Sequence, residues 1–440
     1  MASSDIVETI PDEVNFFAPL IQQSVIVEEF DRQYEPQNNI TAGAPIDFLI
    51  KGVDGYYLDL EHSDLYVRAK ITKANGANMD ANVKAGPVNL TLHSLFQDII
   101  PTLGSVQANI PSNMYPYRSY METALNYSKE TQETRLLSEG WVKDTAGSMA
   151  VTDLAGANTG LRDRATWFAT SNVVEFVGRP HCDIFHQSRL IPPKIDLTLK
   201  LIPAPSQFVC ISAPPGQNAQ QEQFKVVIEH AKFTVRMKRL ADAAEVAIQG
   251  KLQAKKMRLP YTKVEMRQFT IPANVTSQVF ENVFNNALPD LVVIGLVNEE
   301  NFGGHYNRNP FDFQAFGVNR INVYRSGIER PMKGYTPDFG NRRFIEAYKT
   351  LTKELGYNIG DKALSLTPTE WANGFTFYAF KVTDGPIGSG ADSPRSPIPT
   401  GDLKVSIGFS APNNHNIKVV VLAQSVGYMF FDQFKIVTLV

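Results

Sequence analysis

The chain contains very little cysteine, and what it has forms no metal-binding or redox pattern. Only Cys182 and Cys210 occur among 440 residues, and no CxxC pair is present. This excludes a zinc knuckle and a dithiol redox centre, and it is typical of a protein that folds in a reducing compartment. We expect two buried free thiols, with a bridge between them as the alternative.

Long apolar runs are also absent. None reaches the ~18 residues that a membrane-spanning helix needs, so no membrane span is expected. The first residues, MASSDIVETIPDE, lack the basic segment and the apolar stretch of a secretory signal. The four N-x-S/T sequons are therefore expected to stay unmodified; they begin at Asn39, Asn89, Asn126 and Asn274.

A surplus of positive charge is missing as well. The formal net charge is −3, and the first 35 residues carry eight acidic side chains but a single basic one, Arg32. Proteins that bind nucleic acid through its phosphates present a basic face. The short basic run at 251–258 (KLQAKKMR) is interpreted as the solvated end of a helix. We therefore expect no sequence-specific binding of nucleic acid.

Motifs for catalysis and cofactor binding are not found. The sequence has no P-loop, no HExxH and no GxSxG, and GPIGSG at 385–390 has the wrong spacing for a phosphate loop. His181, Cys182, Asp183 and His186 lie close in sequence, but on a strand they would point to alternating faces. Further metal ligands would have to come from elsewhere. We expect no catalytic, cofactor-binding or metal site, and thus no enzyme.

Acidic pairs leave one enzymatic alternative open, because β-sandwich glycosidases use two carboxylates. Three pairs lie close in sequence: Glu299 and Glu300, Asp59 and Glu61, and Asp153 and Asp163. None has the alternating inward positions and the aromatic surroundings of a sugar cleft. The aromatic residues of two strand segments are expected in the core: Phe375, Phe377, Phe380, Tyr428, Phe430 and Phe431. A glycan-binding or hydrolytic β-sandwich protein is the alternative function.

The sequence does contain an internal repeat. The segment 115–129 (YPYRSYMETALNYSK) has a divergent second copy that starts near residue 341 (NRRFIEAYKTLTKE). Five pairs match without a gap: Arg118 with Arg342, Tyr120 with Phe344, Glu122 with Glu346, Lys129 with Lys353, and Glu130 with Glu354. Two similar domains in one chain explain the repeat, and 440 residues suffice for two cores of about 200 residues each.

Around the two copies, apolar residues alternate with a period of two, as in half-buried strands. The clearest cases are 64–72 (DLYVRAKIT), 194–201 (KIDLTLKL) and 401–410 (GDLKVSIGFS). In FKVVIEHAKFTVRMKRL the phase slips between Ile228 and Ala231, which predicts a β-bulge. The pattern indicates an all-β protein.

Each half contains about eight short strands and one inserted helix, expected at 117–136 and at 341–355. Eight strands per half predict two consecutive eight-stranded jelly rolls with short inserted helices. Four parts are expected: an extended N-terminal arm (1–45), a first jelly roll (46–239), a linker helix (240–258) and a second jelly roll (259–440). The linker follows from apolar residues at helical spacing, with Pro260 just beyond them.

Several segments resemble the double jelly-roll major capsid proteins of Polinton/Maverick elements and adintoviruses, which are hexon-like. The resemblance is carried by 115–149, which contains the repeat, and by four further segments in the same order: 56–71, 176–210, 261–313 and 401–425. Two stretches depart from the family pattern, LIPPK at 190–194 and the long loop at 384–400.

The resemblance implies a structural protein, the major capsid protein of an icosahedral double-stranded DNA virus or a virus-derived element. It further implies homotrimers that form pseudo-hexagonal capsomers, since two similar domains under threefold symmetry pack with near-sixfold symmetry. Neighbouring capsomers and penton or minor capsid proteins would be the partners. The protein would be located in the virion, after assembly inside the host cell, in the nucleus.

Overall fold

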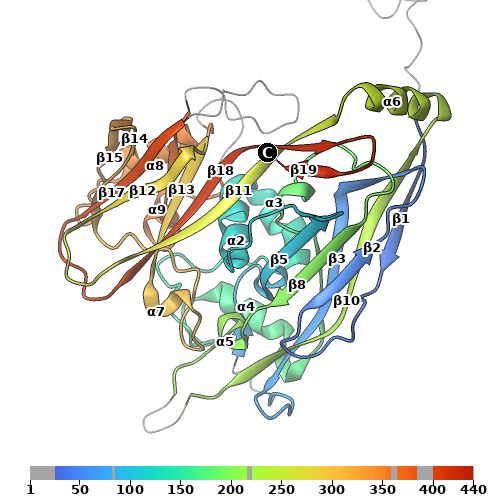
Figure 1. Cartoon of the computed structure of the whole chain (residues 1–440). Helices are drawn as coiled ribbons and strands as arrows, with labels where there is room; N and C mark the ends of the chain where they lie inside the picture. The colour runs from blue at the N-terminus through green and yellow to red at the C-terminus, as the bar shows by residue number, and fades with distance from the viewer. Residues whose placement is uncertain (1–24, 82–84, 216–220, 358–363, 384–399, 440) are drawn as a thin grey trace, which may run out of the picture.

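A computed structural model describes residues 25–81, 85–215, 221–357, 364–383 and 400–439. The Gly-rich segment 385–390 and the first 24 residues of the expected arm lie outside these residues. Figure 1 shows two β-sandwiches side by side, the N-terminal one in blue to green and the C-terminal one in yellow to red. No helix in the described ranges has the length and apolarity needed to cross a membrane.

The first sandwich contains two antiparallel four-stranded sheets and a small strand pair. One sheet has the order β1 (Ile26–Tyr34), β10 (Phe224–Leu240), β3 (Tyr56–Lys73) and β7 (Val174–Gly178). The other has the order β2 (Ile46–Ile50), β8 (Leu197–Pro203), β5 (Phe96–Leu103) and β6 (Val106–Gln107). The pair consists of β4 (Ala85–Pro87) and β9 (Cys210–Ser212).

The second sandwich repeats this plan. One sheet has the order β11 (Met257–Ile271), β18 (Ile417–Phe431), β13 (Leu291–Asn298) and β16 (Phe377–Lys381), with β19 (Val437–Leu439) paired to β18. The other has the order β12 (Ser277–Ala287), β17 (Thr400–Phe409), β14 (Val318–Arg325) and β15 (Ile328–Tyr335). Matching strands in chain order gives the same neighbours in both sandwiches, so the internal repeat reflects two jelly rolls of one topology.

Helices occupy the connections between strands. They are α1 (Thr91–Ser94), α2 (Tyr115–Asn126), α3 (Lys129–Glu133), α4 (Thr159–Trp167), α5 (Ser206–Val209), α6 (Asp242–Ala254), α7 (Glu299–Phe302), α8 (Ile345–Glu354) and α9 (Pro368–Ala372). Three short 3₁₀ turns are η2 (Arg135–Glu139), η3 (Ala169–Ser171) and η4 (Asp183–Phe185).

The two copies of the repeated motif lie at equivalent places. Helix α2 follows β6 and precedes β7, and α8 follows β15 and precedes β16. Both helices are shorter than expected. The first ends at Asn126, and the second begins only at Ile345 because Arg342 has a left-handed backbone (φ 56°) that a helix cannot include.

The predicted strand faces are confirmed. Leu197, Leu199 and Leu201 on β8 are fully buried, and the four alternate apolar residues of β17 from Leu403 to Phe409 are buried as well. The β10–β3 register shifts between Ile228 and His230, where the phase slip predicted a bulge. Cys182 and Cys210 are buried free thiols.

The expected domain limits differ from the structure at the N-terminal side. Residues Ile26–Tyr34, assigned to an arm outside the first jelly roll, form β1 and pair with β10. The boundary at residue 46 is therefore one strand too late. The arm was misjudged because β1 shows no alternation: seven of its nine residues are exposed, so no apolar face marks it. Between the sandwiches lies α6, inside the range given to the linker helix.

Replacing Leu199 by Asp should unfold the first jelly roll. Strand β8 is central, pairing with β2 and β5, and the Leu199 side chain is fully buried, so the carboxylate would have no partner. We expect a loss of about 3–5 kcal/mol in the free energy of unfolding, measured by urea denaturation. Lys200→Asp is the matched control, because the neighbouring Lys200 is exposed. Equal stabilities of the two variants would contradict the assigned faces.

Candidate functional site

Three of the acids weighed as catalytic candidates, Glu299, Glu300 and Asp59, are engaged in structural contacts. Glu299 accepts a hydrogen bond from Asn416 and forms an ion pair with Lys418. Glu300 forms an ion pair with Arg308. Asp59 binds Lys238 at 2.7 Å and His62 at 2.9 Å. Asp59, Glu299 and Glu300 are therefore held by neighbouring side chains.

One pocket in the first jelly roll also lacks the features of a sugar site. Its wall includes Ile40, Ile46, Leu95, Val209 and Ile228, and no residue of the lining carries an aromatic ring or a carboxylate. The aromatic residues behave mostly as expected: Phe375, Phe377, Phe380 and Phe431 are buried. Tyr428 and Phe430 are only half-buried, because they lie on the opposite face of β18, where Arg258 stacks over Tyr428.

The repeated motif itself forms the most elaborate site, at the junction of the two jelly rolls. Helix α2 lies between them (Figure 1), and every residue from Tyr115 to Leu125 is buried. We expected one apolar face with polar groups opposite; in the structure the polar face is buried as well. A helix of this kind cannot be stabilised by solvent on either side, so its polar groups need protein partners.

One face of α2 packs aromatic rings against the second jelly roll. Tyr117 stacks on Phe302 with ring centroids 4.8 Å apart, and its hydroxyl donates a hydrogen bond to the Phe302 carbonyl oxygen at 2.9 Å. Tyr120 stacks on Phe311 at 4.3 Å and contacts Trp141 at 5.3 Å. Positions 117 and 120 are one helical turn apart, so both rings face the same way.

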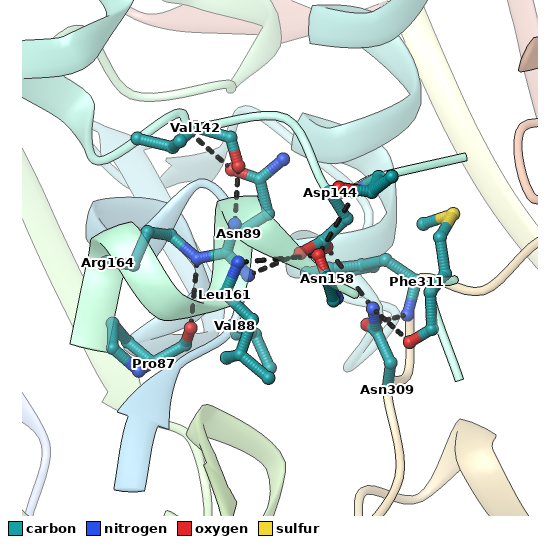
Figure 2. A network of polar contacts seen from close by, with 12 residues as sticks. Pro87, Val88, Asn89, Val142, Asp144, Asn158, Leu161, Arg164, Asn309 and Phe311 are labelled. Carbon is teal, nitrogen blue, oxygen red and sulfur yellow. Dashed lines mark hydrogen bonds and ion pairs between the residues drawn. The ribbon is translucent and has the colours of Figure 1, made fainter. Parts of the chain in front are cut away.

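A buried polar network beside this face joins the two sandwiches (Figure 2). Arg164 on α4 donates to the Pro87 and Val142 carbonyl oxygens and forms an ion pair with Asp144 at 2.7 Å. The other Asp144 oxygen accepts from Asn309 of the second jelly roll at 3.2 Å. Arg164 and Asp144 are completely buried. A buried pair of this kind specifies one arrangement, because a misplaced partner would leave an unpaired charge.

Asn89, one of the sequons, belongs to the same network. Its side-chain oxygen accepts from the backbone N–H groups of Leu90 and Val142, both at 2.8 Å, and the residue is fully buried. A buried side chain that holds two backbone groups cannot carry a glycan in the folded state.

The opposite face of α2 carries a buried ionic cluster. Arg118 donates to Glu122 at 3.0 Å and to Asp183 at 2.7 Å. Asp183 also accepts from the backbone N–H of Val264 on β11, the edge strand of the second jelly roll, at 3.3 Å. Arg118 and Glu122 match Arg342 and Glu346 in the repeat, but those two residues are exposed. The sequence match therefore marks equivalent positions in different environments.

Histidines extend this cluster. The Nδ1 atom of His181 lies 2.6 Å from a Glu122 oxygen, and the His93 Nε2 atom lies 3.1 Å from a Glu139 oxygen. The His93 and His181 rings meet edge to face at 4.7 Å. His186 is partly exposed, although its Nε2 is buried without a hydrogen-bond partner among the described residues.

The sequence argument about residues 181–186 was wrong in its geometry. We assumed a strand with alternating side chains; the segment contains the 3₁₀ turn η4 instead, and His181, Cys182 and Asp183 are all buried. The cluster partners His93, Glu122 and Glu139 come from distant segments. Glu122 could have been found from its place in the repeat, but nothing in the sequence links His93 or Glu139 to His181.

The electrostatics of the cluster are governed by burial. Burial lowers the pKa of His93 and of His186, so both imidazoles are neutral near pH 7. Burial raises the pKa of Asp183 to about 6, against the opposing effect of Arg118. For Glu122 burial alone would raise the pKa, but the Arg118 charge and the His181 bond hold it well below its usual range.

Comparison with known proteins gives a whole-chain likeness in structure. No family model matches the chain. A curated relative, an uncharacterized protein of Caenorhabditis elegans, is 24% identical over an alignment of 361 positions that covers 79% of this chain and 82% of the relative.

A chain of the Sputnik virophage, solved by cryo-EM, superposes with a TM-score of 0.64 at 10% identity, covering 99% of this chain and 92% of that one. The VP54 protein of PBCV-1, fitted into a Sputnik reconstruction, superposes with a TM-score of 0.60 at 12% identity. The match covers 96% of this chain and 99% of VP54. The mavirus major capsid protein superposes with a TM-score of 0.56 at 10% identity, and the match covers 100% of this chain and 96% of the mavirus protein. The fold is a double jelly roll. At these identities the likeness concerns the fold.

Asp144→Asn should weaken the junction strongly. The substitution keeps the shape but leaves the Arg164 charge buried and unpaired, so we expect the free energy of unfolding to fall by about 3–5 kcal/mol. Chemical denaturation followed by tryptophan fluorescence would measure the change. Glu133→Gln is the control, since the Lys129–Glu133 pair is exposed and should leave stability unchanged. A loss as small as in this control would show that the network does not stabilise the fold.

Stability should fall as the pH drops from about 7.5 to about 6. In the unfolded chain a histidine binds a proton near pH 6.5, whereas in the folded protein His93 and His186 have lowered pKa values. Below pH 6.5 the unfolded state therefore binds more protons than the folded state, and the free energy of unfolding falls. Asp183 has a pKa of about 6 in the folded protein, which is above its ordinary value. Below about pH 6 the folded state therefore binds this proton first, which stabilises the folded protein and opposes the effect of the histidines. Each histidine lowers the free energy of unfolding by at most about 1.4 kcal/mol for each pH unit.

Urea denaturation across this pH range would measure the effect, with His186→Gln as the comparison. The glutamine cannot titrate, so the variant should lose part of the pH dependence. A slope that is unchanged in the variant would mean that His186 titrates normally in the folded protein.

Proposed function

We propose that this protein is the major capsid protein of an icosahedral double-stranded DNA virus or of a virus-derived element. The observation that carries the proposal is the duplicated jelly roll of one topology, matched along the whole chain by the mavirus major capsid protein and the Sputnik chain. The protein would act as a structural subunit without enzymatic activity, located in the virion. The ordered sequence motifs favour the Polinton/Maverick and adintovirus type, with assembly in the nucleus.

We propose further that three chains form a pseudo-hexagonal capsomer. The support is an asymmetry between equivalent elements. Strand β11 has buried residues along its length, and η4 of the first jelly roll packs against it, whereas its equivalent β1 has no buried residue. Helix α2 is buried from Tyr115 to Leu125, whereas its equivalent α8 exposes Ile345 by 59%.

The two exposed elements complement each other. Inside the chain, the α2 side of the first jelly roll covers the β11 edge of the second. By analogy, the α8 side of the second jelly roll fits the β1 edge of another copy. Both surfaces carry exposed apolar side chains: Val25, Val27 and Phe30 on or next to β1, and Ile328, Met332 and Ile345 on β15 and α8. A head-to-tail contact repeated three times closes a ring of six jelly rolls.

Light scattering coupled to size exclusion, followed by negative-stain imaging, tests the proposal. A mass three times the 48.9 kDa of the chain and pseudo-hexagonal particles are expected. A stable monomer at micromolar concentrations, without particles in the presence of neighbouring capsomer or penton proteins, would overturn it.

Ile345→Glu should dissociate the trimer without unfolding the chain. The side chain is 59% exposed in the monomer, so a charge is tolerated there, but it would be buried in the contact with β1. We expect trimer affinity to fall roughly tenfold or more, measured by sedimentation. Leu137→Glu is the matched control. Leu137 is 45% exposed on η2, beside β7 and at the opposite edge of the sheet from β1. An equal effect of both substitutions would exclude this contact.

A further inference from the structure

Three potential metal ligands meet on the buried polar side of α2. His93 on α1, Glu139 on η2 and His181 after β7 are all buried, and their ligand atoms lie within 4.8 Å of one another. They come from three segments that are distant in sequence, and three protein ligands would leave one position on a tetrahedral ion open.

Each histidine is held by an outer partner through its Nδ1 atom. Glu122 accepts from the His181 Nδ1 atom at 2.6 Å, which leaves the Nε2 lone pair available. The His93 Nδ1 atom lies 2.8 Å from the Tyr115 hydroxyl, and its Nε2 atom points to Glu139 at 3.1 Å. Metal-binding histidines typically have such a second partner, which fixes the ring and its tautomer.

The charges of the cluster also favour a cation. The side chains joined by hydrogen bonds include three buried acids, Glu122, Glu139 and Asp183, and a single permanent cation, Arg118. Buried carboxylates that outnumber their cationic partners are costly. A divalent cation would offset this excess of acidic side chains.

We propose that His93, His181 and Glu139 bind a zinc ion that has a structural role. Two imidazole nitrogens and one carboxylate suit Zn²⁺ better than the hard cations Mg²⁺ and Ca²⁺, which prefer oxygen ligands only. With zinc–ligand bonds of about 2.0–2.1 Å, tetrahedral donors lie roughly 3.3 Å apart. His93 and Glu139 already have this spacing, and the ligand atoms of the set lie within 4.8 Å of one another, so the side chains would have to close around the ion. A water molecule would supply the fourth ligand.

This site would clamp α1, η2 and the segment after β7 onto the face of α2 that carries Arg118 and Glu122. It differs from our sequence-based expectation that the chain has no metal site, and the measurement below decides between the two. The inference does not rest on the capsid function, because it concerns the folding of a single chain.

The test uses the full chain, produced without a polyhistidine tag. After desalting, inductively coupled plasma mass spectrometry should find one zinc per chain. Removal of the ion with EDTA should lower the melting temperature by at least about 3 °C, and added ZnCl₂ should restore it. Cobalt substitution should give the intense visible absorption of a tetrahedral Co²⁺ site.

Glu139→Gln is the informative variant, because the amide keeps the shape and a hydrogen bond to His93 but binds zinc poorly. It should lose the zinc and no longer respond to EDTA. His62→Gln is the matched control, since His62 is largely exposed and lies outside the cluster. Zinc below 0.1 equivalent in the parent protein, or equal zinc in both variants, would overturn the proposal. The parent measurement decides even if Glu139→Gln fails to fold.

Discussion

The structure depends on the burial of one short helix between two jelly rolls. Because α2 is buried on all sides, its charged groups require protein partners and its aromatic rings require a surface to pack on. Tyr117 and Tyr120 define how the second jelly roll sits against the first, and Arg118 and Glu122 hold the segment after β7 in place. Together with the network of Arg164, Asp144 and Asn309, these contacts set the relative position of the two jelly rolls.

Much of the fold could be predicted from the sequence, because strands with one buried face leave an alternating pattern. The β8 and β17 faces and the bulge in β10 are of this kind. Strand β1 could not be predicted, because a strand exposed on both faces leaves no pattern. The limits of α8 were also missed, since Phe344 and Arg342 resemble helix residues in the first copy but precede the helix here.

The buried cluster shows a second limit of sequence-based prediction. His181 and Asp183 attracted attention because they are neighbours in sequence, yet their partners are Glu122, Arg118 and Val264. Contacts between residues about 60 to 80 positions apart leave no local signal. Only the repeat pointed to α2, and it did so without indicating that the first copy is buried and the second is exposed.

The covalent connection through α6 has a thermodynamic consequence for assembly. In a ring of six jelly rolls made from three chains, half of the contacts form within a chain. For these contacts the linker replaces a bimolecular encounter by an intramolecular one, with an effective concentration in the millimolar range for a short connection. Association of three chains then loses two sets of translational and rotational freedom, whereas six separate jelly rolls would lose five. Duplication of the jelly roll would thus lower the protein concentration at which closed rings form, without any change in the contacts themselves.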